Sequence, residues 1–243
     1  MRPWEPTRRA EPASNYLLAR LSPALLARLD PHLELVELAR GQFLFRAGEP
    51  LMAVYFPDSA VVSFVVRLES GETLDVGFVG REGAAGIAVF PGISTMPCDG
   101  IVQVAGQARQ IRAAILREAV MADTSLWSAL QCVEHLLLVR SMQISVCNAF
   151  HSAEQRCVRW LLVLDDLVGS GPIPVTHELM ASALGIRRPT VTRVLQSLAR
   201  AGLVDEQRGR VSILNRHAVE TVCCECHTVM RLAQHRLVGE AVG

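Results

Sequence analysis

Residues 174–214 read PVTHELMASALGIRRPTVTRVLQSLARAGLVDEQRGRVSIL, and this stretch decides how the rest of the chain is interpreted. Its apolar spacing predicts a helix over 176–184, a glycine turn and a second helix. Ala181, Gly185 and Val191 have the spacing that a helix-turn-helix needs. A small residue lets the two helices approach, a glycine permits the left-handed turn between them, and a branched apolar residue fills their crossing.

The second helix opens at Arg188 and carries a basic face opposite its apolar face. Arginine and threonine gather at its N-terminal end, as in a recognition helix that enters the major groove, where arginine can bond both O6 and N7 of guanine. Residues 171–217 hold seven arginines against three acidic residues, a local excess of +4 in a chain with 24 basic and 24 acidic residues. The competing interpretation, a solvated arginine-rich face, is disfavoured by the joint spacing and charge. The expected DNA-binding residues of this helix are Arg187, Arg188, Pro189, Thr190, Thr192, Arg193, Gln196 and Arg200.

Two short β-rich runs follow the helix pair, and a turn that contains Gly209 joins them. This pattern predicts a hairpin, the wing of a winged helix-turn-helix. Arg208 and Arg210 lie at its tip, where they suit contacts with backbone phosphates. We therefore add these two arginines to the expected DNA-binding residues.

The chain from Leu35 to Arg112 consists of short β-rich runs separated by turn residues, which predicts a β-sandwich, jelly roll or small barrel. Two short helices are expected before it, with Ser22 as the cap of the second, and another helix after it at about 113–122. Residues 1–14 are poor in apolar side chains, so we expect a disordered tail there. The expected strands are 42–46, 53–56, 61–68, 73–79, 101–104 and 107–112.

The stretch from Thr124 to Phe150 contains no glycine or proline and predicts one long helix. Its apolar residues alternate steps of four and three, the period of a coiled-coil seam, with Arg140 as the exception. Periodicity alone leaves two partners open, the chain's own sheet and a second copy. Ser152 and Gln155 then form a capping-box pattern, which predicts a hinge near 149–152. The expected dimer-interface residues are Leu126, Leu130, Val133, Leu137, Ile144 and Cys147.

The composition excludes several classes of protein. Half of the 243 residues are hydrophobic, which excludes a disordered chain, and the zero net charge leaves nucleic-acid binding to local clusters. All 24 basic residues are arginines. Seven scattered cysteines and the lack of a leader predict free thiols in the cytoplasm. Charged residues interrupt every apolar stretch, so we expect no membrane partner.

Three segments resemble a known family. CNAFHSAEQRCVRWLL at 147–162, LGIRRPTVTRVLQSLARAGLV at 184–204 and CCEC at 223–226 resemble the Crp/Fnr family of bacterial transcription regulators, in a subgroup with a CNAxHS hinge. The resemblance covers about residues 15–236. It implies a sequence-specific, homodimeric DNA-binding regulator that is not an enzyme. Its implied partners are palindromic double-stranded DNA and a second copy, with RNA polymerase as a further candidate.

The same resemblance implies how the chain is divided. The implied fold is α+β, with a β-roll sensor of the cupin-like jelly-roll kind over 15–122, a dimerisation helix over 123–150 and a winged helix-turn-helix over 151–243. One departure concerns DNA recognition. Arg188 and Arg193 match the arginines of the family's Arg-Glu pattern, but Pro189 replaces the glutamate, which removes an acceptor for a cytosine amino group.

A second departure concerns the sensor. Members that bind cyclic nucleotides hold the phosphate with a Gly-Glu pair and a later arginine, whereas residues 87–100 of this chain contain no arginine. Asp99 in that stretch would repel an anion. The candidate effector pocket consists of Arg81, Glu82 and Gly83, although Glu82 can also be interpreted as a structural acid in a turn. We expect neither cyclic AMP nor cyclic GMP as effector, and no cofactor.

The cysteines and histidines suggest two rival functions. The CCECH run at 223–227 could supply soft ligands to a thiol- or metal-based redox sensor or binding protein. It lacks the second paired arm of a zinc signature, so packing as buried hydrophobes is favoured and no metal is expected. Cys147 and His151 stand at i and i+4 like a nucleophile and its base. No orienting group or oxyanion-hole motif accompanies them, so we expect no catalytic residues.

Overall fold

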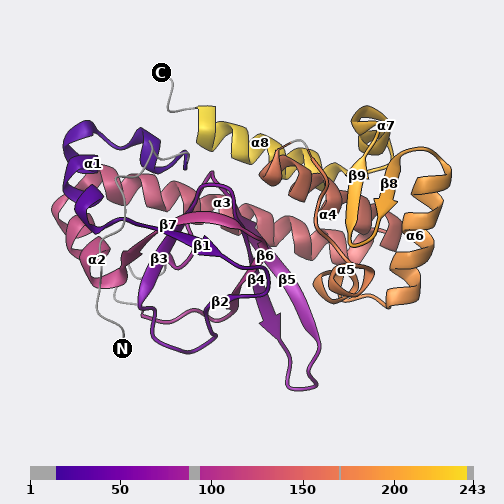
Figure 1. Cartoon of the computed structure of the whole chain (residues 1–243), viewed down its shortest axis with the longest axis horizontal. Coiled ribbons are helices and arrows are strands. Elements are labelled where there is room, and N and C mark those ends of the chain that lie inside the picture. Colours follow the sequence, from indigo (N-terminus) through magenta and orange to yellow (C-terminus); the bar gives the residue numbers. More distant parts are fainter. Residues whose placement is uncertain (1–14, 88–93, 170, 240–243) are drawn as a thin grey trace.

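The computed structural model describes residues 15–87, 94–169 and 171–239, and the tail expected over 1–14 lies outside the described residues. Two antiparallel sheets occupy the N-terminal part, a long helix runs alongside them, and the helix-turn-helix with its wing lies beyond (Figure 1). This order of elements confirms the predicted α+β fold. Within the described ranges, no helix has both the length and the apolar character needed to span a membrane.

Seven strands form the two N-terminal sheets, in the orders β1-β7-β3 and β2-β6-β4-β5. Strands far apart in the sequence are therefore neighbours, as in a jelly roll. Six strands correspond to predicted runs. The additional one, β1, has an exposed outer face and fully buries only Leu38, so its sequence lacks a strong strand signal. The strands are β1 (Glu34–Leu38), β2 (Phe43–Phe45), β3 (Ala53–Pro57), β4 (Val61–Arg67), β5 (Thr73–Val79), β6 (Asp99–Val104) and β7 (Gly106–Arg112).

Short helices precede and follow the strands of the two sheets in the sequence. Ser22 caps α1 as predicted, since its Oγ accepts a hydrogen bond from the Leu25 amide. The segment before α1 is fixed by Asn15, whose buried amide donates to the carbonyls of Pro57 and Gly83 at 2.8 and 2.9 Å. These elements are η1 (Leu18–Arg20), α1 (Pro23–Leu29), η2 (Asp30–His32) and α2 (Ala113–Ala122).

The long helix α3 spans Thr124–Phe150, and α4 spans Ala153–Val168. Between them His151 is extended, and Ser152 and Gln155 form the predicted capping box with hydrogen bonds in both directions. The remaining elements are α5 (His177–Leu184), α6 (Arg188–Arg200), β8 (Val204–Gln207), β9 (Arg210–Ile213), α7 (Arg216–Thr221) and α8 (Glu225–Gly239). Helix α8 turns back and packs along α3 (Figure 1).

The face of α3 that we expected to meet a second copy is buried inside the single chain. Its own sheets, α2 and α8 cover that face, so the coiled-coil period marks an intramolecular contact. A period of apolar residues shows that one face of a helix is covered, but it does not show whether the same chain or a second copy covers it. The fully buried members are Leu126, Leu130, Val133, Ile144 and Cys147, and Leu137 is half-buried against the same core.

One apolar core joins the sheets to the C-terminal part. Phe78 of β5 packs edge-on against Trp160 of α4, with ring centroids 6.5 Å apart. Val61 and Val104 of the sheets belong to the same buried cluster as the interior of the helix-turn-helix. Burial of this size fixes the two parts relative to each other in this conformation.

Arg140, the exception in the apolar period of α3, is buried, and both of its terminal nitrogens donate hydrogen bonds. Its Nη1 donates to the Phe78 carbonyl at 2.7 Å and to Glu82 Oε1 at 2.6 Å. Its Nη2 donates to Gln234 Oε1 of α8 at 2.9 Å. The residue that breaks the hydrophobic pattern thus connects three elements.

Asp75 of β5 lies in the same junction between the sheets and α4. Its carboxylate accepts a hydrogen bond from Ser63 at 3.2 Å and lies 3.5 Å from Trp160 Nε1, with Arg159 as the nearest charge. Burial raises the pKa of Asp75 to about 7, and these three neighbours only partly offset the rise.

The first prediction concerns stability against pH. Because the folded pKa of Asp75 lies above that of the unfolded chain, the folded state holds a proton that the unfolded state has released between about pH 4 and 7. The free energy of unfolding should therefore fall with rising pH in this window, by at most about 1.4 kcal/mol per pH unit from this group. Thermal unfolding of Asp75→Asn should show a flatter profile from pH 5 to 8. The exposed Asp30→Asn serves as control, and a wild-type slope retained in Asp75→Asn would contradict the prediction.

Candidate nucleic-acid interface

The predicted helix-turn-helix is present, with its turn and packing as expected. Thr176 caps α5 by accepting a hydrogen bond from the Leu179 amide. Gly185 adopts the left-handed conformation at φ 60°, which a residue with a side chain enters only with strain. Ala181 and Val191 are buried at the crossing of α5 and α6. The two helices are therefore held at a fixed angle by a short, well-packed turn.

Six arginines of this part form an exposed set, at the cap of α6, along α6 and on the wing. Among the described residues, none of the six makes an ion pair with an acidic side chain. Unpaired guanidinium groups remain available for phosphate and base edges. The six are Arg187, Arg188, Arg193, Arg200, Arg208 and Arg210.

The other expected residues of α6 divide into two groups. Pro189 and Gln196 are exposed, and Thr190 is half-buried. Thr192 is also half-buried, and its hydroxyl donates to the Arg188 carbonyl at 3.2 Å and lies 2.9 Å from His177 Nδ1. Its hydroxyl is engaged within the protein, so Thr192 holds α6 against α5.

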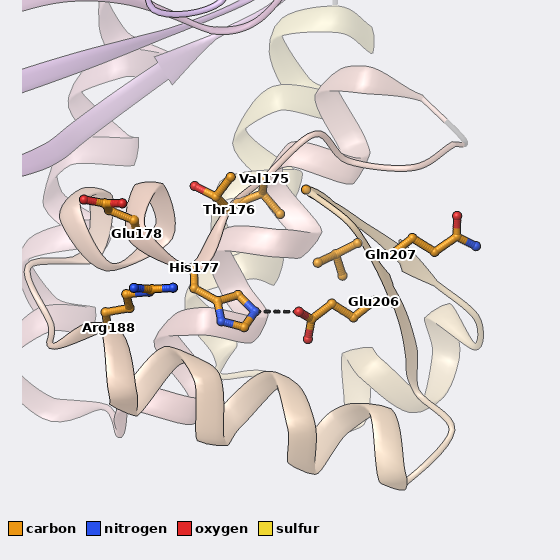
Figure 2. Close-up of a pocket in the computed structure, with 9 residues that line it drawn as sticks. Val175, Thr176, His177, Glu178, Arg188, Glu206 and Gln207 are labelled. Atoms are coloured by element: carbon orange, nitrogen blue, oxygen red, sulfur yellow. Dashed lines mark hydrogen bonds and ion pairs between the residues drawn. The ribbon is translucent and has the colours of Figure 1, made fainter.

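A pocket of about 400 Å³ lies between the start of α5, the start of α6 and the wing (Figure 2). Inside it His177 Nε2 lies 2.7 Å from Glu206 Oε1 of β8. His177 thereby links the wing to α6 through Thr192. The Thr192 hydroxyl, the His177 imidazole and the Glu206 carboxylate form a continuous series of contacts. Because the hydroxyl already donates to a backbone carbonyl, these contacts serve to fix α6 and the wing in place. The lining residues are Val175, Thr176, His177, Glu178, Arg188, Glu206, Gln207, Gly209 and Val211.

Arg216, counted in the local excess of positive charge, does not belong to the exposed set. Its guanidinium pairs with Asp165 and Asp166 of α4 and with Glu220 one turn along α7. His227 of α8 also contacts Asp166, at 2.8 Å. This ion-pair group fastens α7 and α8 to α4 and leaves the interface to the six exposed arginines.

The three residues of the expected effector pocket do not converge on one cavity. Glu82 is buried against Arg140, which fits its interpretation as a structural acid. Arg81 turns towards the end of α4, where its Nη2 donates to the Val168 carbonyl at 3.4 Å. Gly83 packs so closely that an added Cβ would lie 2.9 Å from Val133. Each of the three therefore has a packing role.

The structure brings together two pairs of residues that lie far apart in the sequence. Cys147 and His151 at the hinge meet Cys224 and Cys226 at the start of α8. His227 points elsewhere, to Asp166. The paired spacings of i, i+4 and i, i+2 were the only signal of this cluster in the sequence, because the two pairs could be joined only by the fold.

The Cys147 and His151 pair does not have the properties of a nucleophile and its base. A hydrogen bond with Cys224 and burial raise the pKa of Cys147 to about 12. A neutral thiol is a poor nucleophile. The geometry therefore gives no support to thiol catalysis.

Comparisons with known proteins agree with this geometry. Residues 155–222 match the family model of the Crp-like helix-turn-helix domain, and no curated protein matches the chain. The fold is similar to that of FixK2 from Bradyrhizobium japonicum, at 16% identity and a TM-score of 0.69 over 79% of this chain and 98% of that chain.

It is also similar to a protein from Eubacterium rectale assigned to the Crp/Fnr family of transcriptional regulators, at 18% identity and a TM-score of 0.67 over 86% and 98% of the two chains. The c-di-GMP-responsive global regulator CLP of Xanthomonas campestris is similar at 18% identity and a TM-score of 0.64, over 80% and 100%. The described chain thus has the same fold as these three proteins, and its residues 155–222 match the family model of the Crp-like helix-turn-helix domain.

Proposed function

We propose that the protein is a sequence-specific transcription regulator that binds double-stranded DNA as a homodimer. The observation that carries this proposal is the set of six exposed, unpaired arginines on α6 and the wing of a Crp-like helix-turn-helix. A chain with zero net charge that concentrates unpaired arginines on one such element has its electrostatic footprint for DNA there.

The arginines divide by position into two roles. Arg188 and Arg193 lie on the first turns of α6, the end that enters the major groove in a recognition helix, so we assign them to base edges. Arg200 at the end of α6 and Arg208 and Arg210 on the wing are assigned to phosphates. Pro189 offers no acceptor for a cytosine amino group, so the half-site should differ from that of regulators with glutamate there.

A two-fold symmetric dimer follows from the way such helices read palindromic sites. We place its contact on the outer face of α3, since the face that we first expected is buried. Four large apolar side chains lie exposed there at spacings of four. They are Leu138, Met142, Val146 and Phe150, exposed by 51, 55, 45 and 81%.

For the sensor, we propose that cyclic nucleotides are not the effectors. The rings of Phe45 and Phe64 pack in the interior of the β-roll with centroids 6.2 Å apart, and Phe45 lies directly against Gly100. The Asp99 carboxylate accepts a hydrogen bond from the Ala47 amide at this end of the sheet. A buried cyclic phosphate would meet this acid, and Arg67, which lies 4.0 Å from the same carboxylate, is half exposed and already paired with it.

The second prediction tests the DNA readout. Arg193→Ala should weaken binding to the preferred site by about 1 to 3 kcal/mol and relax specificity at one position, because a base contact is lost. Arg208→Ala should weaken all sequences alike and lower the salt slope by about 1, because one phosphate contact is lost. Selection of duplexes from a random pool, followed by titration at several salt concentrations, measures both effects. Arg28→Ala, exposed on α1, is the control, and an unchanged motif in Arg193→Ala would refute the assignment.

The third prediction tests the dimer. Met142→Asp combined with Val146→Asp should give monomers, because two carboxylates would be buried at the contact. Affinity for a palindromic duplex should then fall by about 100-fold or more, since the two half-sites no longer bind together. Light scattering and duplex titration measure the two effects. Met121→Asp on α2, where the side chain is 77% exposed, should remain dimeric. A wild-type monomer that binds a palindrome tightly would show that α3 is not the seam.

The fourth prediction concerns the sensor. Calorimetry of the nucleotide-stripped protein should detect no binding of cyclic AMP or cyclic GMP at physiological concentrations. The test has a clear opposite result. A micromolar dissociation constant that Arg81→Ala abolishes would mean that the turn at Gly80–Gly83 holds phosphate.

A further inference from the structure

A cluster of three cysteines and one histidine lies where the hinge meets the C-terminal helix. Cys147 lies in the last turn of α3 and His151 lies in the hinge, whereas Cys224 and Cys226 flank Glu225 at the start of α8. One ligand atom from each of the four lies within 4.8 Å of all the others. All three cysteines are buried, and the His151 side chain is 13% exposed.

The separations fit a single tetrahedral ion. Cys147 Sγ and Cys224 Sγ are 3.7 Å apart, and Cys226 Sγ is 3.5 Å from His151 Nδ1. Around Zn²⁺ with its usual bond lengths, tetrahedral ligands stand about 3.8 Å apart for two sulfurs and about 3.6 Å apart for sulfur and nitrogen. A [4Fe–4S] cluster would need the thiolates further apart, because there each thiolate binds a different iron atom.

The surroundings of the cluster supply two further features of a metal site. His151 directs Nδ1 at Cys226, and its Nε2 lies 3.3 Å from Glu225 Oε2. A carboxylate on the second nitrogen is the usual way in which a metal-binding histidine is oriented.

The second feature is a buried cation beside the sulfurs. Arg159 is 1% exposed, and its Nε donates to Cys147 Sγ at 3.2 Å. Its Nη1 has no hydrogen-bond partner, and among the described residues it makes no ion pair with a carboxylate. Asp75 interacts with Arg159 electrostatically without forming an ion pair. A buried charge with no counter-charge in direct contact is costly. A centre of three thiolates, one neutral imidazole and one divalent ion carries a net charge of −1 and would neutralise it.

We propose that Cys147, His151, Cys224 and Cys226 form a mononuclear Cys₃His site for a tetrahedral divalent transition-metal ion, with Zn²⁺ as the occupant. Binding forms three metal–sulfur bonds and one metal–nitrogen bond, and the three thiols release their protons to water. No electron is transferred. The ion would enter from the side of His151, the partly exposed member of the group, next to the exposed Glu225.

The position of the site defines what the ion would do. It would join the last turn of α3 and the hinge to the start of α8, two segments 77 residues apart in the sequence. Without it, the contact between the Cys147 and Cys224 thiols and the contacts of His151 with Cys226 and Glu225 link these segments. Loading would therefore brace the hinge between the long helix and the helix-turn-helix, a role that does not depend on whether the protein binds DNA.

The experiment, the fifth prediction, uses the full-length protein, reduced and stripped with a chelator under anaerobic conditions. Titration with Zn²⁺ should give one equivalent per chain and raise the unfolding temperature. Co²⁺ should bind with the same stoichiometry and show thiolate-to-cobalt charge transfer together with the intense visible bands of a tetrahedral ion. X-ray absorption at the zinc edge of the wild-type protein should show three sulfur ligands and one nitrogen, a readout that needs no variant.

Variants test the ligand set. Cys224→Ser and Cys226→Ser should lose stoichiometric binding and the charge-transfer band. Cys223→Ser, next to the cluster but outside it, and Cys132→Ser, exposed on α3, should keep one equivalent. Hydrogen exchange should slow at the hinge on loading of the wild-type protein and remain unchanged in Cys224→Ser.

Three results would overturn the proposal. The first is wild-type protein that takes up no Zn²⁺ or Co²⁺ when fully reduced. The second is an absorption spectrum with fewer than three sulfurs or with metal–metal scattering. The third is loss of the ion in Cys223→Ser.

Discussion

The buried guanidinium of Arg140 is the interaction on which the arrangement of this protein depends. It joins the end of β5 to α3 and α8 through the Phe78 carbonyl, Glu82 and Gln234. Removing one partner from a buried ion pair leaves the other charge without compensation, which is strongly destabilising. The pair therefore specifies one position of α3 against the sheet, and that position decides which face of α3 is left exposed.

The same end of β5 connects the N-terminal sheets to the helix-turn-helix part. Phe78 packs on Trp160 and Asp75 contacts the indole nitrogen of that residue, so α4 rests directly on the sheet. Further along, Thr73 Oγ1 lies 2.5 Å from Ser182 Oγ of α5. A displacement of β5 would reach the helix-turn-helix through packed contacts without passing along α3. Close-packed junctions of this kind shift between discrete arrangements, which suits a switch.

The arginines that hold elements together differ in their charge partners from the arginines of α6 and the wing. Acidic side chains neutralise the arginines that hold elements together, as Glu82 does for Arg140 and Asp165 and Asp166 do for Arg216. The arginines of α6 and the wing have no such partners in the described chain. Equal totals of basic and acidic residues thus conceal an interface with a local excess of positive charge.

Local rules made the helix-turn-helix, its caps and the exposed arginines predictable from the sequence. The left-handed turn at Gly185, the capping box at Ser152 and the 3.6-residue period of α6 each depend on residues a few positions apart. Two features were not predictable in this way. Helix α3 carries apolar residues on all sides, as at Leu136, Leu137 and Leu138, so only packing against the sheets and α8 decided which face is buried. The cysteine–histidine cluster joins segments 77 residues apart, and no local period records which distant side chains the chain will bring together.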